Sequence, residues 1–239
     1  MLRSTRNVRC AAMMGIALLP TLALAQTRAV FASSDGAAQI TRLQVSTTTG
    51  TVDLNATFRG WYSADGSNNG RSPAGNYLAG RCDAVPLCFT PAIVLNNWFT
   101  FDLANVTGRT ITGATLFLDS PAGVGYLSAN PSETFSLFDV ATVLNTLGIA
   151  VGVSIFNDLG SGTLFGTRSV SAADNGTSVA SVLNSSALAA LTSAQGASFG
   201  IGGAVTLTTT LLPEPSTYVL MLVGLAAVGV AARRRRVLQ

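Results

Sequence analysis

The chain of 239 residues contains no histidine and no lysine. Without an imidazole ring it can form neither a Ser-His-Asp triad nor a Cys-His pair, and no histidine can ligate a metal ion. Two carboxylates could still serve a glycosidase. However, Glu133 and Glu214 are the only glutamates, and the aspartates stand mainly beside Gly, Ala or Asn, in settings typical of turns. The sequence therefore predicts that the protein is not an enzyme.

The first 25 residues have the three regions of a secretory signal peptide in the right order. Three arginines precede the apolar stretch AAMMGIALLPTLALA, which ends in Ala23-Leu24-Ala25, the small-x-small pattern that signal peptidase accepts. A core helix does not fit the proline within this stretch or the polar residues that begin at Gln26. We therefore predict a signal peptide over residues 1–25, cleaved between Ala25 and Gln26.

Cysteine is scarce as well, with three residues in the chain, of which Cys10 leaves with the signal peptide. The other two, Cys82 and Cys88 in RCDAVPLC, stand six residues apart around a proline, a spacing that can close a small loop in an oxidising compartment. We expect a disulfide between them, with a stabilisation of about 2–3 kcal/mol in the chain-entropy model. A metal site is the alternative, although two thiols without further Cys or His ligands do not make a tetrahedral zinc site.

A second long apolar run, Thr217 to Ala232, holds 16 residues and is followed by Arg233-Arg234-Arg235-Arg236. A helix of that length reaches about 24 Å, short of a hydrocarbon core of about 30 Å. The segment is therefore a marginal transmembrane helix, which snorkelling arginines could extend. The positive-inside rule places the four arginines on the cytoplasmic side. Together the two ends predict a translocated body that is held for a time by a short tail.

The order Pro213-Glu214-Pro215-Ser216, apolar helix 217–232, arginine cluster 233–236 resembles the PEP-CTERM sorting signal of Gram-negative bacteria. The resemblance implies that an exosortase cuts near Pro213-Glu214-Pro215, after transient anchoring in the inner membrane. It also implies release to the cell surface or the extracellular matrix, often together with exopolysaccharide. A Gram-positive sortase signal shares the Leu-Pro start, but Pro215 and Ser216 stand where Thr and Gly are required. A GPI signal lacks the terminal arginines.

Between the signal peptide and the sorting signal (213–239) lies a body of residues 26–212, long enough for one domain with a hydrophobic core. This body carries seven arginines against nine aspartates and Glu133, a net charge of −3. The net charge of +3 of the whole chain therefore comes from its two ends. Nucleic-acid binding needs a basic patch on the body itself and is not expected. A surface rich in Thr, Ser, Asn and Gly suits an extracellular protein.

Apolar and polar residues alternate along most of the body, as in VDLNATF, FTFDL, ATLFLDS and TFSLF. This period of two predicts half-buried strands. Further strands are predicted over 149–156, 163–170, 177–183, 198–201 and 204–210, and helices over 141–147 and 185–195. The stretch RGWYSADGSNNGRSPAGNYLAGR (59–81) is predicted to be an exposed loop. Short strands separated by turn signals predict an all-β fold, an antiparallel β-sandwich of jelly-roll type.

The stretch from Trp98 to Val205 resembles a jelly-roll module of secreted bacterial proteins, similar in pattern to carbohydrate-binding modules. The segments TITGATLFL and ETFSLFDV carry this resemblance. It implies that the first segment is a core strand and the second its neighbour, and it brings no residue-level binding site.

Two groups of residues are candidates for binding. The rings of Trp61, Tyr62 and Trp98 could stack on sugars, since flat rings cover the apolar faces of pyranoses, and packing in the core is the alternative.

Asp65, Ser67 and Asn69 occupy positions one, three and five of a possible calcium loop, and a solvated loop is the alternative. Apart from this structural calcium, the sequence predicts no cofactor.

These features predict an exported, non-enzymatic protein of the cell surface or of an extracellular polysaccharide or biofilm matrix, with a structural or adhesive role. The expected partners are signal peptidase, exosortase, the inner membrane for a time, and exopolysaccharide. The second hypothesis is a carbohydrate-binding module that recognises exopolysaccharide. A secreted hydrolase of unknown type is the third.

Overall fold

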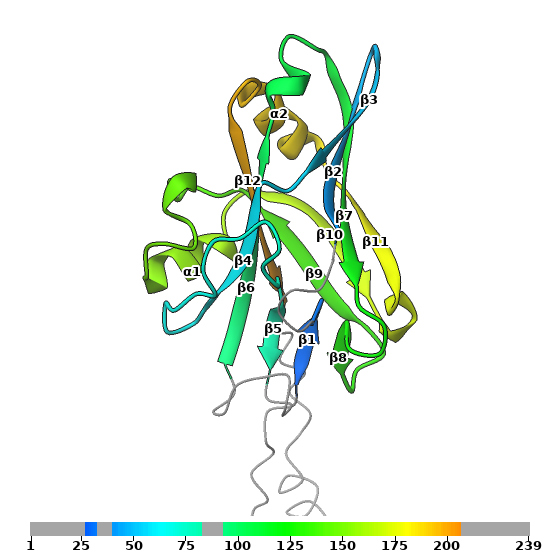
Figure 1. Ribbon diagram of the computed structural model, residues 1–239. Coiled ribbons are helices and arrows are strands. Elements are labelled where there is room, and N and C mark those ends of the chain that lie inside the picture. Colours follow the sequence, from blue (N-terminus) through cyan, green and yellow to red (C-terminus); the bar gives the residue numbers. More distant parts are fainter. Residues whose placement is uncertain (1–26, 33–39, 83–92, 207–239) are drawn as a thin grey trace, which may run out of the picture. The chain divides into compact units, whose positions relative to one another are not determined.

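The computed structural model describes residues 27–32, 40–82 and 93–206 (Figure 1). Most of them belong to antiparallel strands, so the predicted all-β class is confirmed. The strands are β1 (Arg28–Val30), β2 (Thr41–Thr47), β3 (Gly50–Asn55), β4 (Phe58–Ser63), β5 (Ala79–Cys82), β6 (Ile93–Asp102), β7 (Ile111–Ser120), β8 (Tyr126–Ser128), β9 (Glu133–Phe138), β10 (Leu164–Val170), β11 (Thr177–Val182) and β12 (Ser198–Val205). The helices are α1 (Val153–Leu159), α2 (Ser185–Ser193) and the 3₁₀ turns η1 (Ala104–Val106), η2 (Leu144–Thr146) and η3 (Ala172–Asp174).

The strands form two antiparallel sheets. Sheet A has the order β10-β9-β12-β6-β5-β1-β8, and β4 also pairs with β6. Sheet B has the order β11-β7-β2-β3. Hydrogen-bonded neighbours such as β2 and β7, or β6 and β12, are far apart in the sequence. Pairing within each sheet therefore depends on long-range contacts, as is usual for all-β proteins.

The two segments that carried the jelly-roll resemblance do not pair with each other. TITGATLFL lies in β7 of sheet B, whereas ETFSLF forms β9 of sheet A. The expectation that they are neighbouring strands is therefore wrong. Alternation identifies a strand with one buried face, but two sheets that enclose a common core both produce that pattern.

A common hydrophobic core fills the space between the sheets. Leu43 and Val45 of β2 enter it from sheet B, and Phe99 and Phe101 of β6 enter it from sheet A. All four side chains are fully buried. Since burial of one such side chain contributes about 1.5–3 kcal/mol, this core is the main source of stability for the fold.

Sheet A also carries apolar side chains on the face that points away from sheet B. Tyr62 and Trp98 pack there with Ile155 and Leu159 of α1, beside β4 and β6 (Figure 1). The cover is close, because a Cβ atom at Gly202 of β12 would lie 2.6 Å from the backbone oxygen of Leu159. Sheet A is thus covered on both faces along its centre.

By the described residues, sheet B is covered on one face only, as the burial of β2 shows. Residues 41, 43, 45 and 47 are buried, whereas Arg42, Gln44 and Ser46 are half-buried on the outer side. On that outer side the Arg42 guanidinium lies 4.4 Å from the ring centre of Phe117 and bonds Asp53. This is the apolar-inside, polar-outside pattern of an antiparallel sheet with one solvated face.

One of the two predicted helices is confirmed. The helix expected over 185–195 is α2, and the Asn184 side chain caps it by accepting a hydrogen bond from Ala187 N at 3.1 Å. In the other, 141–147, only the short turn η2 forms. The strand expected over 149–156 is wrong, because the chain enters α1 at Val153 and the alternating residues before it point to solvent.

The stretch 59–81 is not the exposed loop that its composition predicted. Its first residues belong to β4, its last belong to β5, and Trp61, Tyr62 and Tyr77 are buried. Glycine and asparagine correctly marked the turns between them, but the aromatic residues signalled core packing.

Among the described residues, no helix is long and apolar enough to cross a membrane. The predicted signal helix (1–25) and sorting helix (217–232) lie outside them. All described residues belong to one compact unit, residues 25–208.

Candidate functional site

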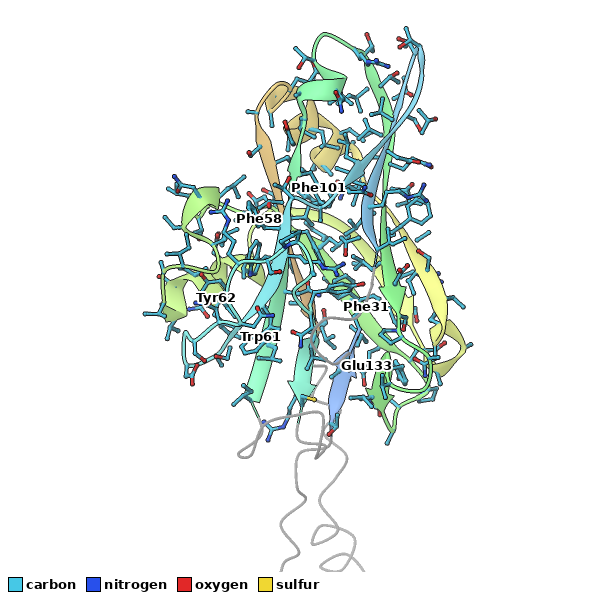
Figure 2. All side chains as sticks on the ribbon, viewed as in Figure 1. Phe31, Phe58, Trp61, Tyr62, Phe101 and Glu133 are labelled. Atoms are coloured by element: carbon cyan, nitrogen blue, oxygen red, sulfur yellow. The ribbon has the colours of Figure 1, made fainter. Side chains whose placement is uncertain are left out.

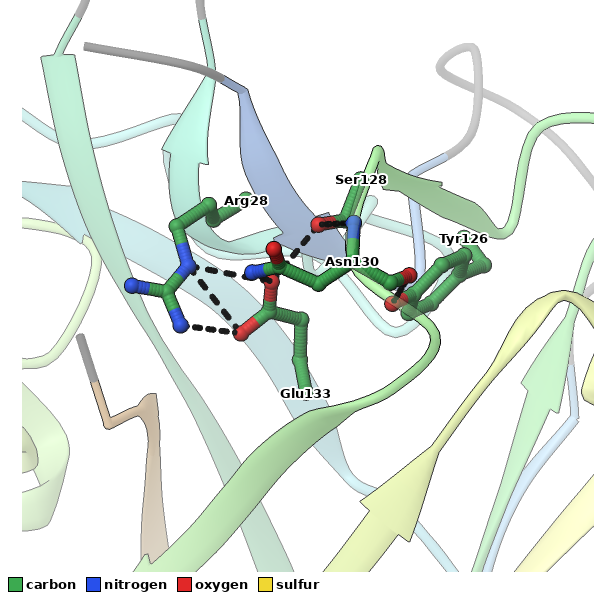
Figure 3. A network of polar contacts seen from close by, with 5 residues as sticks. All are labelled: Arg28, Tyr126, Ser128, Asn130 and Glu133. Carbon is green, nitrogen blue, oxygen red and sulfur yellow. Dashed lines mark hydrogen bonds and ion pairs between the residues drawn. The ribbon is translucent and has the colours of Figure 1, made fainter. Parts of the chain in front are cut away.

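Glu133, the first residue of β9, is held by polar groups from two neighbouring strands and a turn (Figure 3). Arg28 of β1 donates from Nε to Oε1 at 3.0 Å and from Nη2 to Oε2 at 2.9 Å. Ser128 Oγ and Asn130 Nδ2 donate to Oε1 at 2.6 and 2.7 Å. The Glu133 side chain is only 1% exposed, and these hydrogen bonds stabilise its buried negative charge.

Strand pairing and a tight turn place these donors. Arg28 stands directly opposite Ser128 in the antiparallel pair of β1 and β8. Tyr126 OH donates to the Asn130 backbone oxygen at 2.6 Å, which closes the turn between β8 and β9. The network therefore joins β1, the first described strand, to β8 and to the beginning of β9.

The electrostatics of this site favour the ionised pair. Burial alone would raise the pKa of Glu133, but the hydrogen bonds from Arg28, Ser128 and Asn130 outweigh it and lower the pKa below its ordinary value. The hydrogen bond to Glu133 raises the pKa of Arg28. A carboxylate with a lowered pKa and four short hydrogen bonds is poorly suited to act as a general acid or as a nucleophile.

The last described strand ends beside the same point. Thr206 N donates to the Thr134 backbone oxygen at 2.9 Å, and Thr134 directly follows Glu133. The Thr206 hydroxyl also lies 3.2 Å from Ser136 Oγ. The beginning of β1 and the end of β12, the first and last described strands, thus both lie beside the beginning of β9. In the sequence, Arg28 follows the predicted signal-peptidase site by two residues, and Pro213 follows Thr206 by seven.

The three rings proposed for sugar stacking are buried, so that hypothesis is wrong for this conformation. Tyr62 and Trp98 are fully covered and lie together in the cluster beneath α1, and Trp61 belongs to a separate cluster (Figure 2). The polar atoms of two of these rings also bond inside the protein, since Trp61 Nε1 donates to Asn76 Oδ1 at 2.7 Å and Tyr62 OH donates to Ala150 O at 2.7 Å. These rings pack the core, and sugar cannot reach their faces.

The proposed calcium residues do not converge. Asp65 Oδ1 accepts hydrogen bonds from Ser67 N at 2.9 Å and from Ser67 Oγ at 2.8 Å, the pattern of an Asx turn. Asn69 Oδ1 points elsewhere and accepts from Trp61 N at 2.8 Å. The three side chains act as local braces of the turn and do not form an oxygen cage.

Several predicted site residues lie outside the described residues. They include Ala23, Ala25 and Gln26 of the signal-peptidase site, Pro213 to Ser216 of the sorting motif, and Arg233 to Arg236. Cys82 is buried at the end of β5, but Cys88 is also outside, so the disulfide stays a prediction.

Sequence reasoning did not find the role of Arg28 and treated Glu133 only as a possible catalytic acid. The two residues are 105 positions apart, and no local pattern links them. The one available signal was a single glutamate at the beginning of an apolar strand, because a charge in such a place needs a partner when it is buried.

The family model described as the PEP-CTERM protein-sorting motif matches residues 212–236. Comparisons with curated proteins and with solved structures find no match. The matched residues contain Pro213, Glu214, Pro215, the apolar run and the four arginines, the same features that the sequence brought together. Over residues 212–236, this chain carries a PEP-CTERM protein-sorting motif.

Proposed function

We propose that this chain is an exported, exosortase-processed, non-enzymatic protein of the cell surface or of the extracellular polysaccharide or biofilm matrix. The observation that carries the proposal is the PEP-CTERM motif at residues 212–236. An apolar helix of marginal length suits transient residence in the inner membrane, before cleavage near Pro213-Glu214-Pro215 releases the body.

The described body supports a structural or adhesive role in two ways. Glu133, the single glutamate of residues 26–212, accepts hydrogen bonds that join β9 to β1 and to β8. Aspartates at turns, such as Asp65 and Asp174, likewise accept hydrogen bonds from nearby groups. The carbohydrate-binding alternative would need a surface other than the buried rings of Trp61, Tyr62 and Trp98.

A jelly-roll topology is part of the proposal. It is supported by the way the chain crosses repeatedly between the two sheets. The chain passes from β2 and β3 in sheet B to β4, β5 and β6 in sheet A, and then back to β7 in sheet B. Later, β11 of sheet B comes between β10 and β12 of sheet A in the sequence. Such crossings are typical of wrapped antiparallel sandwiches.

Intact-mass measurement tests the export route. In cells that contain an exosortase, the extracellular protein should begin at Gln26 and end near Pro213-Glu214-Pro215. Glu214→Ala, or deletion of residues 233–236, should leave uncleaved precursor in the inner membrane. Arg109→Ala removes an exposed arginine from the body and is the matched control, which should be processed normally. An extracellular protein that still ends at Gln239 would contradict the proposal.

A further inference from the structure

Exposed aliphatic side chains gather in one loop of the body, residues 143–153, called here the apolar loop. Among the described residues, seven large apolar side chains are exposed, and four of them lie in this loop: Val143, Ile149, Val151 and Val153. Val151 reaches 76% exposure. The loop contains no charged residue. A concentration of exposed apolar groups of this kind usually marks an interaction surface.

The backbone of the apolar loop is fixed by a facing loop, residues 65–71, which runs in the opposite direction. Arg71 Nη1 donates to Asn145 O at 2.6 Å at one end. Gly152 N donates to Gly66 O at 2.9 Å at the other end. The two loops therefore lie side by side along their whole length (Figure 1).

Further contacts hold the middle of the apolar loop. Ala150 O accepts hydrogen bonds from Tyr62 OH at 2.7 Å and from Asn68 Nδ2 at 3.0 Å. Gly148 N donates to Tyr62 OH at 2.9 Å. Because residues 148, 150 and 152 bond inward, the alternate residues 149, 151 and 153 are the ones left exposed. The loop thus presents aliphatic side chains on a rigid support, without any cost of ordering the backbone upon binding.

The two ends of the facing loop carry opposite charges. Arg71 lies 4.0 Å from the ring centre of Phe58, and within the described ranges it forms no ion pair with a carboxylate. Asp65 is exposed, and hydrogen bonds from Ser63 and Ser67 lower its pKa to about 2, so it is ionised at any physiological pH. An uncharged apolar strip is therefore bordered by Asp65 at one end and by Arg71 at the other, where the Asp158 carboxylate also accepts hydrogen bonds from Ala141 N and Thr142 N.

We propose that the apolar loop is a self-association surface whose partner is a second copy of this chain. A two-fold axis through such a strip brings the same residues of both copies together, as in any isologous interface. Antiparallel packing of two strips would place each Arg71 near the partner's Asp65 and bury the aliphatic side chains between them. The charges are complementary only in this arrangement, which also fixes the register of the two copies.

Other occupants fit the surface less well. An anionic lipid surface would meet Asp65 as well as Arg71 on a body whose net charge is −3, and a polysaccharide would find no exposed aromatic ring in the loop on which to stack. The proposal does not depend on where the chain is cleaved. Its failure would show in the association state, and failure of the proposed export route would show in the intact mass.

Sedimentation of the purified extracellular protein over a range of concentrations tests the proposal. The wild type should form dimers, and Val151→Asp should weaken dimerisation at least about tenfold, since it places a charge in the apolar contact. Val182→Asp is the matched control, because Val182 is 72% exposed but lies on β11 outside the loop. It should dimerise like the wild type. A wild type that stays monomeric at about 1 mM would overturn the proposal.

A charge exchange tests the register. Arg71→Glu and Asp65→Lys should each weaken dimerisation, and the double variant should restore it, because a cation then again faces an anion across the axis. Rescue cannot come from the fold of one copy alone, and circular-dichroism melting shows whether each variant is folded. No rescue in folded variants would remove the proposed register. Vesicle binding that Val151→Asp abolishes, with a monomeric wild type, would make the loop a membrane contact and overturn the proposal.

Discussion

In sheet A the central strand β6 is buried at every position from Leu95 to Phe101, whereas in sheet B the strand β2 is buried only at alternate positions. The two sheets share one core and the same antiparallel pairing, so pairing does not explain the difference. The cause is the second layer on sheet A, where α1 and the apolar loop cover Tyr62 and Trp98. Within the part of the chain that the structure describes, sheet B packs only against the common core.

The ion pairs of the two sheets also differ in how deeply they are buried. Arg28 and Glu133, which join strands of sheet A, are 18% and 1% exposed, and the carboxylate accepts bonds from two further side chains. Arg42 and Asp53 on the outer side of sheet B are 32% and 48% exposed. Water can replace either partner of the second pair but not Glu133. One ion pair is therefore part of the interior, and the other lies on the surface.

The largest expected difference between the sheets concerns two aromatic residues. Trp98→Ala removes a fully buried ring from the outer cluster of sheet A and should lower the free energy of unfolding by about 3–5 kcal/mol. Phe117→Ala removes a half-buried ring from the outer side of sheet B and should cost less than about 1 kcal/mol. Urea unfolding of the extracellular protein measures both. Equal losses would mean that the outer layer of sheet A contributes little to stability.

A smaller difference is expected between the ion pairs. Glu133→Gln keeps the shape of the side chain but leaves the half-buried Arg28 charge unpaired, and should cost about 2 kcal/mol. Asp53→Asn is the matched change on sheet B and should alter stability by less than about 0.5 kcal/mol. The midpoints of urea unfolding at neutral pH give the comparison. A cost for Asp53→Asn as large as that for Glu133→Gln would contradict the division between interior and surface pairs.

The same comparison explains which parts of the fold could be predicted from the sequence. Alternation identified strands of sheet B in VDLNATF and ATLFLDS and strands of sheet A in FTFDL and TFSLF, because the apolar positions of each segment face the common core. It failed for 149–153, where alternate aliphatic residues face solvent instead of a core. It also failed for β4, whose Trp61 and Tyr62 were taken for residues of an exposed loop. A second layer on a sheet is formed by distant segments, and a local pattern does not contain them.

Of the functional residues, only those that are consecutive in the chain could be predicted from the sequence. The sorting motif could be found because its proline, apolar and arginine segments are consecutive in the chain. The contact between Arg28 and Glu133 could not, since the pairing of β1 with β8 and the turn between β8 and β9 create it. Likewise, the 65–71 and 143–153 loops are far apart in the sequence, and no local pattern contains the contacts between them, such as Gly152 N to Gly66 O.

Acidification provides the most detailed test of the interior ion pair. In the folded protein the pKa of Glu133 is lowered from its ordinary value of 4.5, so unfolding raises it. The stability that Glu133 contributes is therefore complete above about pH 4.5 and is lost as the pH falls through the lowered pKa of the folded state. The difference in unfolding free energy between wild type and Glu133→Gln should accordingly be constant near neutral pH and shrink on acidification. Asp65→Asn isolates the contribution of Asp65 to stability. Folding lowers the pKa of Asp65 from 3.8 to about 2, so this contribution is lost only as the pH falls from about 3.8 towards 2. Parallel curves for wild type and Glu133→Gln between pH 7 and about pH 3 would show that the buried carboxylate is not stabilised in its ionised form.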